Sequence, residues 1–500
     1  MLPLNAGQEP FILVVDIGTS SLRAMVVDGQ ARPIDGLYVR REHQPHVTRE
    51  GGAELDPAPL FENFVSALDE LLGRSGDLRI SAVAASTLAH NVLGADREGN
   101  PITPIYLYSD SRAAAVTERL RTRVDWGQIY ARTGCPLHTG YLPERLLWFS
   151  ETYPALRPER WLSLHEWILF RLFGRTVASQ SYASWTGMLN RERTDWDEGL
   201  LALVQVDRGT LSPIVPAGES LRGMVAPYRQ RWPALAETPF FPAIGDGAAA
   251  HLGSGCIAPA CVSVTAGTSA AVRVVLPASP AQPIPDGLWL YTVDERRALL
   301  GGSLNNAGDA YDYLHGLLQR PPVQVEEREL SAMPPDSHGL TILPFFSGER
   351  SPGYHGNARA SIVGLSLNSS PDELVRAAIE SVAFRLAVIY RLVLKAVPGP
   401  EEIIASGSSL LRSPTWAQIL ADVLNKPVTL AGNDEPSAVG AALMAQQALG
   451  VIPDVSAFEA PRGRTFLPDA ARHEKYELAM TRHQNLYERV MGGWYRAGSE

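Results

Sequence analysis

Lysine is nearly absent from this 500-residue chain. Its three lysines, Lys395, Lys426 and Lys475, all lie in the last quarter of the sequence. The residues before them therefore cannot contain a G-x-x-x-x-G-K-S/T phosphate loop or a lysine that forms a Schiff base. A phosphate bound by this part of the chain must be neutralised by backbone dipoles, arginine and a metal ion.

Cysteine is also rare, and long apolar runs are missing. Cys135, Cys256 and Cys261 form no C-x-x-C pair and no zinc-ligand set, which predicts three reduced thiols in a cytoplasmic protein. No run approaches the roughly 18 apolar residues of a membrane span, and the first residues lack the pattern of a signal peptide. The net charge of −10 argues against nucleic-acid and anionic-membrane partners. We therefore expect a cytoplasmic protein without either partner.

The size and composition of the chain indicate a globular protein with two domains. Apolar residues make up 45% of the sequence and charged residues 20%, as is typical of globular proteins. A single hydrophobic core stops growing beyond about 250–300 residues, so 500 residues predict two domains of similar size.

A short hairpin near the N-terminus is repeated later in the chain. Residues 11–28, FILVVDIGTSSLRAMVVD, are two β-rich apolar runs joined by a tight turn. In this turn, Gly18 lets a ligand approach the backbone, three hydroxyl residues follow, and Arg23 adds positive charge. Residues 262–275, VSVTAGTSAAVRVV, repeat the pattern. One such turn alone is more typical of an ordinary β-turn. Two copies predict two related lobes, each with a phosphate-binding turn facing a shared cleft.

Periodicity and end signals predict the helices. Ser-Pro-Asp-Glu at residues 370–373 is a capping box, so a helix should begin there and continue to about residue 397. Residues 179–197 lack a clean period and are predicted to form a loop, and residues 321–335 a solvated excursion. Further helices are expected at residues 57–72, 113–121, 144–149, 162–173, 414–424 and 436–449, and a strand at residues 80–87.

Three polar side chains occupy positions that suit ligand binding. His90 follows the predicted strand 80–87, and open α/β sheets bind ligands at the carboxyl ends of their strands. Asp110 is expected to cap the helix 113–121, although such a carboxylate can also face a sugar hydroxyl. Asp246 lies between two glycines shortly before the second hairpin. This position favours a ligand-facing carboxylate, although Asp-Gly is also a frequent turn.

Several longer motifs occur in an order that is typical of one enzyme family. Residues 360–380, ASIVGLSLNSSPDELVRAAIE, fit the second signature of that family. The supporting motifs are DIGTSSLR from Asp16, GDGAAA from Gly245, AGTSA from Ala266, GGSLNN from Gly301, FFSGERSP from Phe345, and ADVLNKPV with EPSAVGAALMA near the end. On these motifs the chain resembles the FGGY family of carbohydrate kinases over essentially its whole length.

The resemblance implies a fold and a reaction. The expected fold is α/β, with the two-lobed architecture of actin and hexokinase, in which two ribonuclease H-like domains enclose a cleft. We expect an N-terminal lobe at residues 1–247 and a C-terminal lobe at residues 248–500. The implied reaction is transfer of the γ-phosphate of ATP to a sugar hydroxyl with Mg²⁺, and closure of the lobes on the sugar would exclude water.

The resemblance also implies roles for individual residues. Asp246 would be the general base that takes the proton from the sugar hydroxyl, and with Asp16 it would hold Mg²⁺. The phosphates would bind to Gly18, Thr19, Ser20 and Arg23 on one side and to Gly267 and Thr268 on the other. Adenosine would lie against Gly407 and Ser408, and the sugar against Ala89, His90, Asp110 and Asp246. The family usually has Gly-Gly where this chain has Gly407-Ser408, so Ser408 could shift the nucleotide or weaken its binding.

Residues 90–190 resemble gluconate kinases more than other members, which implies D-gluconate as substrate and 6-phosphogluconate as product. A carboxylate substrate needs a cation or strong donor, and Arg112, His90 and His138 are the alternatives. Xylulose is the second choice, because xylulose kinases share the scaffold. Outside this class, the chain could be an actin-fold ATPase that drives partner binding, or a sugar-binding regulator with a decayed active site. A homodimer is possible.

Overall fold

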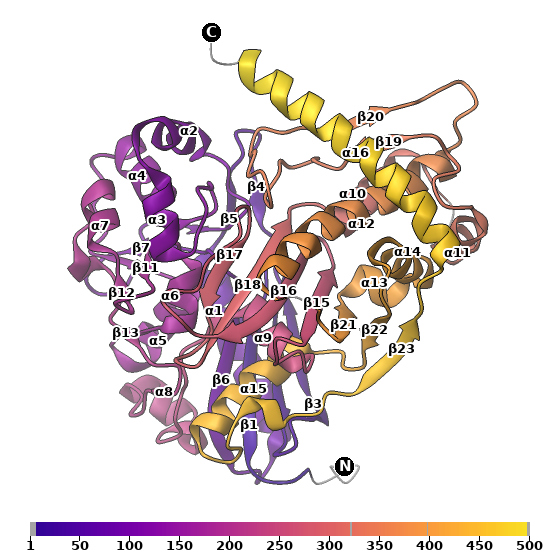
Figure 1. The fold of residues 1–500 in the computed structure, drawn as a ribbon. Coiled ribbons are helices and arrows are strands. Elements are labelled where there is room, and N and C mark those ends of the chain that lie inside the picture. The colour runs from indigo at the N-terminus through magenta and orange to yellow at the C-terminus, as the bar shows by residue number, and fades with distance from the viewer. Residues whose placement is uncertain (1–6, 321–322, 398, 498–500) are drawn as a thin grey trace.

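The computed structural model describes residues 7–320, 323–397 and 399–497 as two lobes, each built around a β-sheet (Figure 1). The helices are α1 (Pro57–Ser75), α2 (Ala114–Arg123), α3 (Trp126–Thr133), α4 (Leu142–Thr152), α5 (Leu164–Phe173), α6 (Gln180–Trp185), α7 (Glu198–Val204), α8 (Ala226–Arg231), α9 (Asp246–Gly253), α10 (Gly308–Leu317), α11 (Val323–Ala332), α12 (Pro371–Ala396), α13 (Ser408–Arg412), α14 (Pro414–Leu424), α15 (Pro436–Ala448) and α16 (Ala470–Ala497). Short strands outside the two main sheets are β4 (His46–Val47), β5 (Ala53–Leu55), β7 (Leu93–Ala95), β8 (Ile105–Tyr106), β9 (Arg160–Leu162), β10 (Ala178–Ser179), β11 (Leu189–Asn190), β12 (Asp195–Trp196), β13 (Ile214–Val215), β19 (Thr341–Leu343) and β20 (Ser361–Val363).

The sheet of the N-terminal lobe has the order β14-β6-β1-β2-β3. Its strands are β1 (Phe11–Ile17), β2 (Ser21–Val27), β3 (Pro33–Glu42), β6 (Ile80–Thr87) and β14 (Ile244–Gly245). The first three strands form an antiparallel meander, and β6 and β14 add to β1 in parallel. The predicted hairpin at residues 11–28 is therefore confirmed.

The sheet of the C-terminal lobe repeats this topology. Its order is β17-β18-β16-β15-β21-β22-β23, with strands β15 (Cys261–Ala266), β16 (Ala270–Pro277), β17 (Trp289–Thr292), β18 (Arg297–Leu304), β21 (Glu402–Ser406), β22 (Val428–Ala431) and β23 (Arg462–Phe466). The meander β15-β16-β18 is antiparallel, and β21 and β22 add to β15 in parallel. The second hairpin and the duplicated two-lobed fold are thus confirmed.

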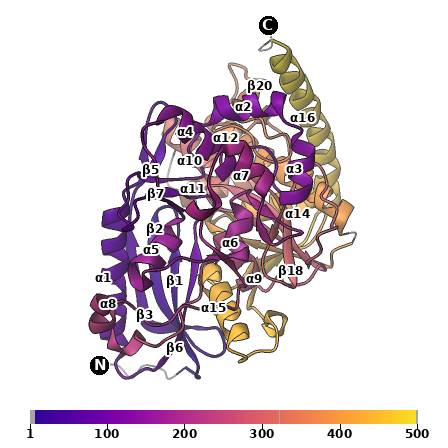
Figure 2. The same ribbon diagram turned by 90° about the vertical axis from the view of Figure 1, so that its left-hand side faces the viewer.

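Strand β1 is buried on both faces. Alternate side chains of a strand point to opposite sides of the sheet, so its residues belong to two different cores. Leu13, Val15 and Ile17 belong to a core shared with α1 and α5. Ile12 and Val14 belong to a second core, which contains residues of α9 and α15 and also side chains from the C-terminal lobe. Figure 2 shows α1 and α15 on opposite sides of this sheet.

Helices α9 and α15 hold the same place in the two repeats, since each follows the last parallel strand of its lobe, and they pack against each other. Their crossing depends on two glycines. A Cβ atom on Gly253 would lie 1.9 Å from the carbonyl oxygen of Pro436, and one on Gly440 would lie 1.9 Å from that of Ala249. The absence of both side chains therefore lets the two backbones touch and brings the lobes together.

Most predicted helices are confirmed, and three local predictions are wrong. The capping box of Ser370 and Glu373 is formed, and α12 ends one residue before Val397. The segment 179–197, predicted to be a loop, contains α6 and the β11-β12 pair, and the predicted excursion 321–335 contains α11; residues 321 and 322 lie outside the described part. Asp110 does not cap α2, which begins at Ala114, because its carboxylate accepts hydrogen bonds from the backbone of Ala53 and from Arg112.

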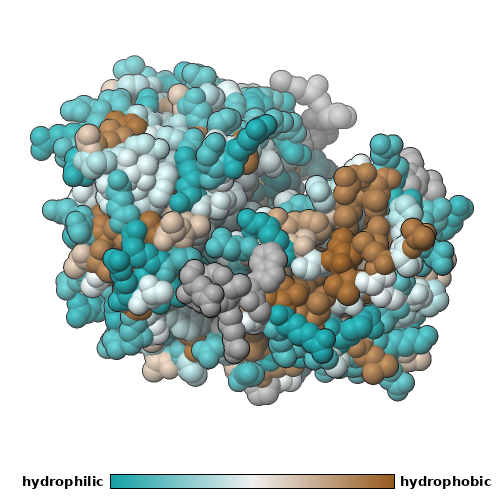
Figure 3. Space-filling model, turned by 90° about the horizontal axis from the view of Figure 1, so that it is seen from above, coloured by the Kyte–Doolittle hydropathy of each residue, from teal (hydrophilic) through white to brown (hydrophobic). Residues whose placement is uncertain are grey.

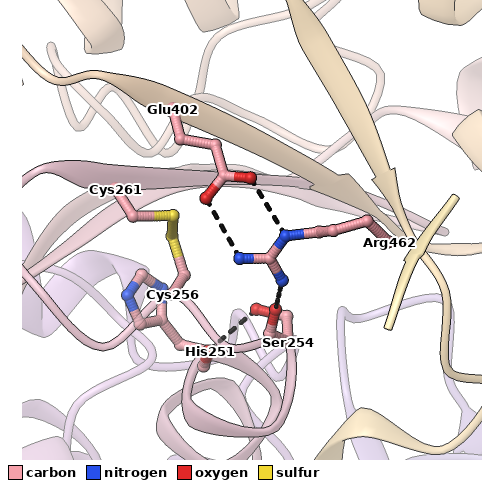
Figure 4. Close-up of a disulfide and its surroundings, with 6 residues drawn as sticks. All are labelled: His251, Ser254, Cys256, Cys261, Glu402 and Arg462. Atoms are coloured by element: carbon pink, nitrogen blue, oxygen red, sulfur yellow. Dashed lines mark hydrogen bonds and ion pairs between the residues drawn. A yellow bond between two sulfur atoms is a disulfide. The ribbon is translucent and has the colours of Figure 1, made fainter. Parts of the chain in front are cut away.

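The prediction of three reduced thiols is also wrong. Cys256 and Cys261 form a disulfide, which closes the turn between the end of α9 and the start of β15 (Figure 4). Beside it, Arg462 pairs with Glu402 and donates a hydrogen bond to the carbonyl oxygen of Ser254 at 2.9 Å. Cys135 is a buried free thiol. The disulfide thus reinforces the connection between the two lobes.

Hydrophobic side chains gather on part of the surface seen from above (Figure 3). Large exposed apolar side chains of the C-terminal lobe include Val363, Leu365 and Leu367, at and after the end of β20. Such side chains suit a protein contact, and the homodimer remains a prediction. Among the described helices, none has both the length and the apolar character required to cross a bilayer.

Counting thiols tests the disulfide. We expect one reactive thiol per chain, that of Cys135, in denaturant without reductant, and three after reduction. The double variant Cys256→Ser/Cys261→Ser should lower the unfolding free energy by about 2 kcal/mol, because the unfolded chain loses a short closed loop. Three thiols without reductant would contradict the disulfide.

The helix crossing is tested by Gly440→Ala. We expect an overpacking cost of about 2–3 kcal/mol, because the new methyl group overlaps a backbone oxygen that cannot move away alone. Gly73→Ala in α1 is the matched control: a Cβ at Gly73 meets nothing within 4 Å, so this change should be neutral or stabilise by up to about 1 kcal/mol. Thermal unfolding of both variants measures the difference, and equal midpoints would refute the packing argument.

Candidate active site

A cavity of about 490 Å³ lies between the lobes. Residues of both lobes line it, among them Tyr108, Ser111, His138, Asn305 and Asp309. A second cavity, of about 520 Å³, lies within the C-terminal lobe between α10, α11, α13 and α14. Its lining residues are Tyr311, Asp312, Glu327, Leu330, Ile379, Ser409, Arg412, Ser413 and Trp416.

Asp16 closes β1, where the antiparallel register pairs it with Arg23 on β2. The guanidinium of Arg23 donates from Nη1 to Asp16 Oδ2 and to Glu435 Oε2, each at 3.2 Å. The hydroxyl of Ser86 on β6 donates to the other carboxylate oxygen of Asp16. Burial raises the pKa of Asp16, and the hydrogen bond from Ser86 and the charge of Arg23 oppose this shift.

Asp246 is the first residue of α9, directly after β14. The backbone N–H of Gly247 donates to its Oδ1 at 2.7 Å. Burial and then the negative charge of Asp16 raise the pKa of Asp246 to about 6, against the opposing effects of Gly247 and Arg273. A carboxyl group with this pKa is ionised at neutral pH and is a better proton acceptor than an ordinary aspartate.

The two Gly-Thr-Ser turns are held by different contacts. In the first, Gly18 N donates to Ser21 O at 2.9 Å, and the ring of His43 contacts Gly18 O at 3.0 Å. In the second, the carbonyl of Gly267 accepts from Gly308 N at 2.8 Å and from the hydroxyl of Ser409 at 3.2 Å. Both turns remain accessible at their tips, Ser20 and Thr268.

Comparison with known proteins is decisive for the family. Residues 11–253 match the N-terminal domain of the FGGY family of carbohydrate kinases, and residues 262–449 match its C-terminal domain. The chain belongs to the FGGY family of carbohydrate kinases. It is therefore an ATP-dependent carbohydrate kinase, which is a phosphotransferase.

Individual relatives of this kinase differ in their substrates. Gluconokinase of Bacillus subtilis (strain 168) is 25% identical over 95% of this chain and 94% of its own length. Glycerol kinase of Citrifermentans bemidjiense is 28% identical over 94% of this chain and 96% of its own length. The crystal structure of ligand-bound xylulose kinase from Lactobacillus acidophilus has a TM-score of 0.89 at 25% identity, covering 97% of this chain and 99% of that chain.

The residues predicted to bind the sugar differ in their accessibility. Ala89 is partly accessible, whereas His90 is buried with its Nδ1 against the carbonyl of Trp185. Asp110 is buried, and its carboxylate is bound by the backbone of Ala53 and by Arg112. The neighbours of Asp110, Ser109 and Ser111, line the cleft instead. Asp110 is therefore engaged in holding the lobe together.

None of the three alternatives for binding a substrate carboxylate is a free cation. Arg112 pairs with both Asp110 and Glu54 and stacks on Trp148 at 4.8 Å. Burial, with the nearby charges of Arg350 and Arg145, lowers the pKa of His138 to about 3 and that of His90 well below its usual value. Both histidines are thus neutral at physiological pH.

Of the residues predicted to bind adenosine, Gly407 lies against the second turn with φ of 92°. A Cβ there would lie 2.4 Å from the carbonyl oxygen of Ala266, so glycine is required. The side chain of Ser408 is exposed, and its Oγ is 3.9 Å from a Cβ built on Gly267. Ser409, which the sequence prediction missed, connects the second turn to the cavity that it lines.

Two further arginines escaped the sequence prediction. Arg273 on β16 donates to Thr265 Oγ1 at 3.2 Å, and burial lowers its pKa to about 10 although Asp246 acts to raise it. Arg273 lies on the second strand of the repeated hairpin, as Arg23 lies on the second strand of the first hairpin. This correspondence could have identified Arg273 from the sequence. Arg350 lies in the FFSGERSP motif, but the sequence alone does not show whether it has a partner.

The raised pKa of Asp246 predicts that Asp246→Asn stabilises the ligand-free protein. Its folded-state pKa of about 6 lies above the ordinary value of 3.8, so the ionised wild type loses stability as pH rises from about 4 to 6. Above this range the advantage of the variant should be constant, on the order of 2 kcal/mol. Thermal unfolding without nucleotide at pH 4.5 and 7.5 tests this. A variant no more stable at pH 7.5 than at pH 4.5, relative to wild type, would contradict the shift.

Proposed function

We propose that this kinase transfers the γ-phosphate of ATP to the terminal hydroxyl of D-gluconate and forms 6-phosphogluconate, with Asp246 as general base. The observation that carries the proposal is the carboxylate of Asp246, with a pKa of about 6, beside Asp16 and at the start of α9. Phosphoryl transfer needs alignment, charge neutralisation and one proton acceptor. Asp246 meets the last of these needs.

The phosphates of ATP are proposed to bind between the two turns, at Gly18, Thr19, Ser20 and Arg23 and at Gly267 and Thr268. Backbone N–H groups and an arginine then replace the lysine that this region lacks. Adenosine is proposed to bind at Gly407 and Ser408 and to extend into the 520 Å³ cavity. Ser409 would keep the second turn in register with this cavity, because its hydroxyl is bonded to Gly267 O.

Mg²⁺ fits the carboxylates of Asp16 and Asp246. Hard oxygen ligands suit this ion, and each carboxylate raises the cost of ionising the other, as the effect of Asp16 on the pKa of Asp246 indicates. A divalent cation would relieve this repulsion. When bound, it supplies charge neutralisation for the phosphoryl group. Asp16, which is contacted by Arg23 and Ser86, is the proposed ligand through water, together with Asp246.

We propose gluconate ahead of other acceptors because relatives named gluconokinase match 95% and 88% of the chain. Xylulose is the alternative, supported by the similarity to a xylulose kinase structure.

Ala89 and His90 are proposed to contact the substrate. Asp110 is proposed to act through its neighbours Ser109 and Ser111, which line the cleft. We also propose a lobe boundary at residues 247 and 248 and a cytoplasmic location.

Replacing the base tests this function. Asp246→Asn should reduce kcat with gluconate by about 10²–10⁴-fold, while nucleotide binding stays within a few-fold of wild type. ADP release is measured with gluconate, xylulose, ribulose and glycerol as acceptors. Undiminished gluconate turnover in the variant would reject Asp246 as the base. Absent gluconate turnover in the wild type, with xylulose accepted, would replace gluconate by xylulose.

A further inference from the structure

Arg350 follows Phe346 and Ser347, which line the cavity between the lobes, and itself lines a small pocket that shares Asn305 with this cavity. The carbonyl of Arg350 accepts a hydrogen bond from Tyr354 N at 2.6 Å. The next residue, Ser351, exchanges two hydrogen bonds with Ser303 on β18, at 2.9 and 3.0 Å. The preceding Glu349 is buried and engaged with Arg385 and Tyr487. Both neighbours of Arg350 are therefore fixed to the C-terminal lobe, and so is the backbone that carries its side chain.

The guanidinium of Arg350 has no anionic partner among the described residues. No carboxylate oxygen of the described chain lies within 4 Å of it, and its Nε is buried without a hydrogen-bond acceptor. The buried Arg376 and Arg385 each pair with a glutamate, Glu380 and Glu349. An uncompensated buried cation is costly, and this cost is removed when an anionic ligand binds.

Most groups around Arg350 are tyrosines and histidines, and Asp246 and Arg273 also lie near enough to be affected by its charge. Burial acts to lower the pKa of Arg350, and four nearby tyrosines, Tyr291, Tyr141, Tyr354 and Tyr108, outweigh it. The charge of Arg350 contributes to the lowered pKa of both His90 and His138, so these rings stay neutral beside it. It also acts on Asp246, whose pKa it helps to lower. The cation thus lies on the side of the cleft where sugar binding is proposed.

Other arginines near the cleft are less suited to bind a substrate anion. Arg112 is neutralised by two carboxylates. Arg145 donates to the backbone carbonyls of His90 and Leu107. Arg273 is bound to Thr265 beside the second turn, which suits a contact with the transferred phosphate. Arg359 lines the cleft but is exposed, so water weakens its ion pairs.

We propose that Arg350 binds the carboxylate of a sugar-acid substrate and so selects sugar acids over neutral sugars. This inference rests on the proposed function. A guanidinium binds a carboxylate through two parallel hydrogen bonds, and the tyrosines around it can donate further ones. Binding the acid end at Arg350 leaves the terminal hydroxyl of the open chain for Asp246. The transferred phosphoryl group is the other anion that Arg350 could contact, and the experiment separates the two.

The test uses Arg350→Gln and Arg350→Lys with acidic and neutral acceptors. For the Gln variant we expect KM for gluconate to rise about 100-fold or more, with kcat within a few-fold and turnover of xylulose or glycerol within about threefold. The Lys variant keeps the charge but not the two-pronged geometry, so it should recover part of the loss. Arg391→Gln, at a surface pair with Glu477, is the matched control and should change nothing. Preserved turnover of a neutral acceptor also shows that the variant is folded.

Each other result overturns a defined statement. Equal loss of kcat with acidic and neutral acceptors would place Arg350 at the phosphoryl group and reject the inference. An unchanged KM for gluconate would reject it as well. If the wild type does not phosphorylate gluconate, the proposed function fails, and calorimetric binding of other hexonates and pentonates to wild type and Arg350→Gln decides the inference separately. Equal affinity of both proteins for every sugar acid would then refute it.

Discussion

The close crossing of α9 and α15 is the constraint on which the arrangement of the active site depends. Its closeness comes from Gly253 and Gly440, which place backbone against backbone. Asp246 begins α9, and Glu435 is the N-cap residue of α15. Because Glu435 binds Arg23, which in turn binds Asp16, the crossing fixes all four charged groups relative to one another. A change in helix spacing would therefore displace Asp246 and the pair of Asp16 and Arg23 together.

The charges of this site are arranged for function at a cost in stability. Asp16 and Asp246 are both raised in pKa by burial, and Asp16 adds to the shift of Asp246. Among the described residues, Arg273 and Arg350 have no carboxylate within ion-pair distance, whereas the buried Arg376 and Arg385 each have one. Such unbalanced groups are expected where ligands complete the electrostatics. Nucleotide, metal and sugar together would supply the missing charges of both signs.

The sequence was sufficient for features that depend on neighbours along the chain. Both hairpins, the capping box at Ser370 and the strand at residues 80–87 follow from local periodicity and turn chemistry, and the repeated hairpin also predicted the repeated lobes. The roles assigned to Asp16, Asp246 and the turn residues remain predictions, although the structure brings Asp16, Arg23 and Asp246 together. The prediction for Asp110 failed because a partner that is distant in the sequence takes part. Asp110 was expected to cap a helix, but Ala53 and Arg112 compete for its carboxylate.

The same distinction explains why Arg350 could not be selected from the sequence. An arginine in a glycine- and proline-containing motif gives no sign of whether a carboxylate faces it, and the adjacent Glu349 suggests a local pair. In the structure Glu349 is taken by Arg385, whose guanidinium stacks over Tyr487 and Phe345. Glu349 is therefore not available to pair with Arg350. No carboxylate of the described residues pairs with Arg350, so its side chain keeps a positive charge that an anionic ligand can compensate. The identity of that ligand is then a question of which end of the substrate carries the anion.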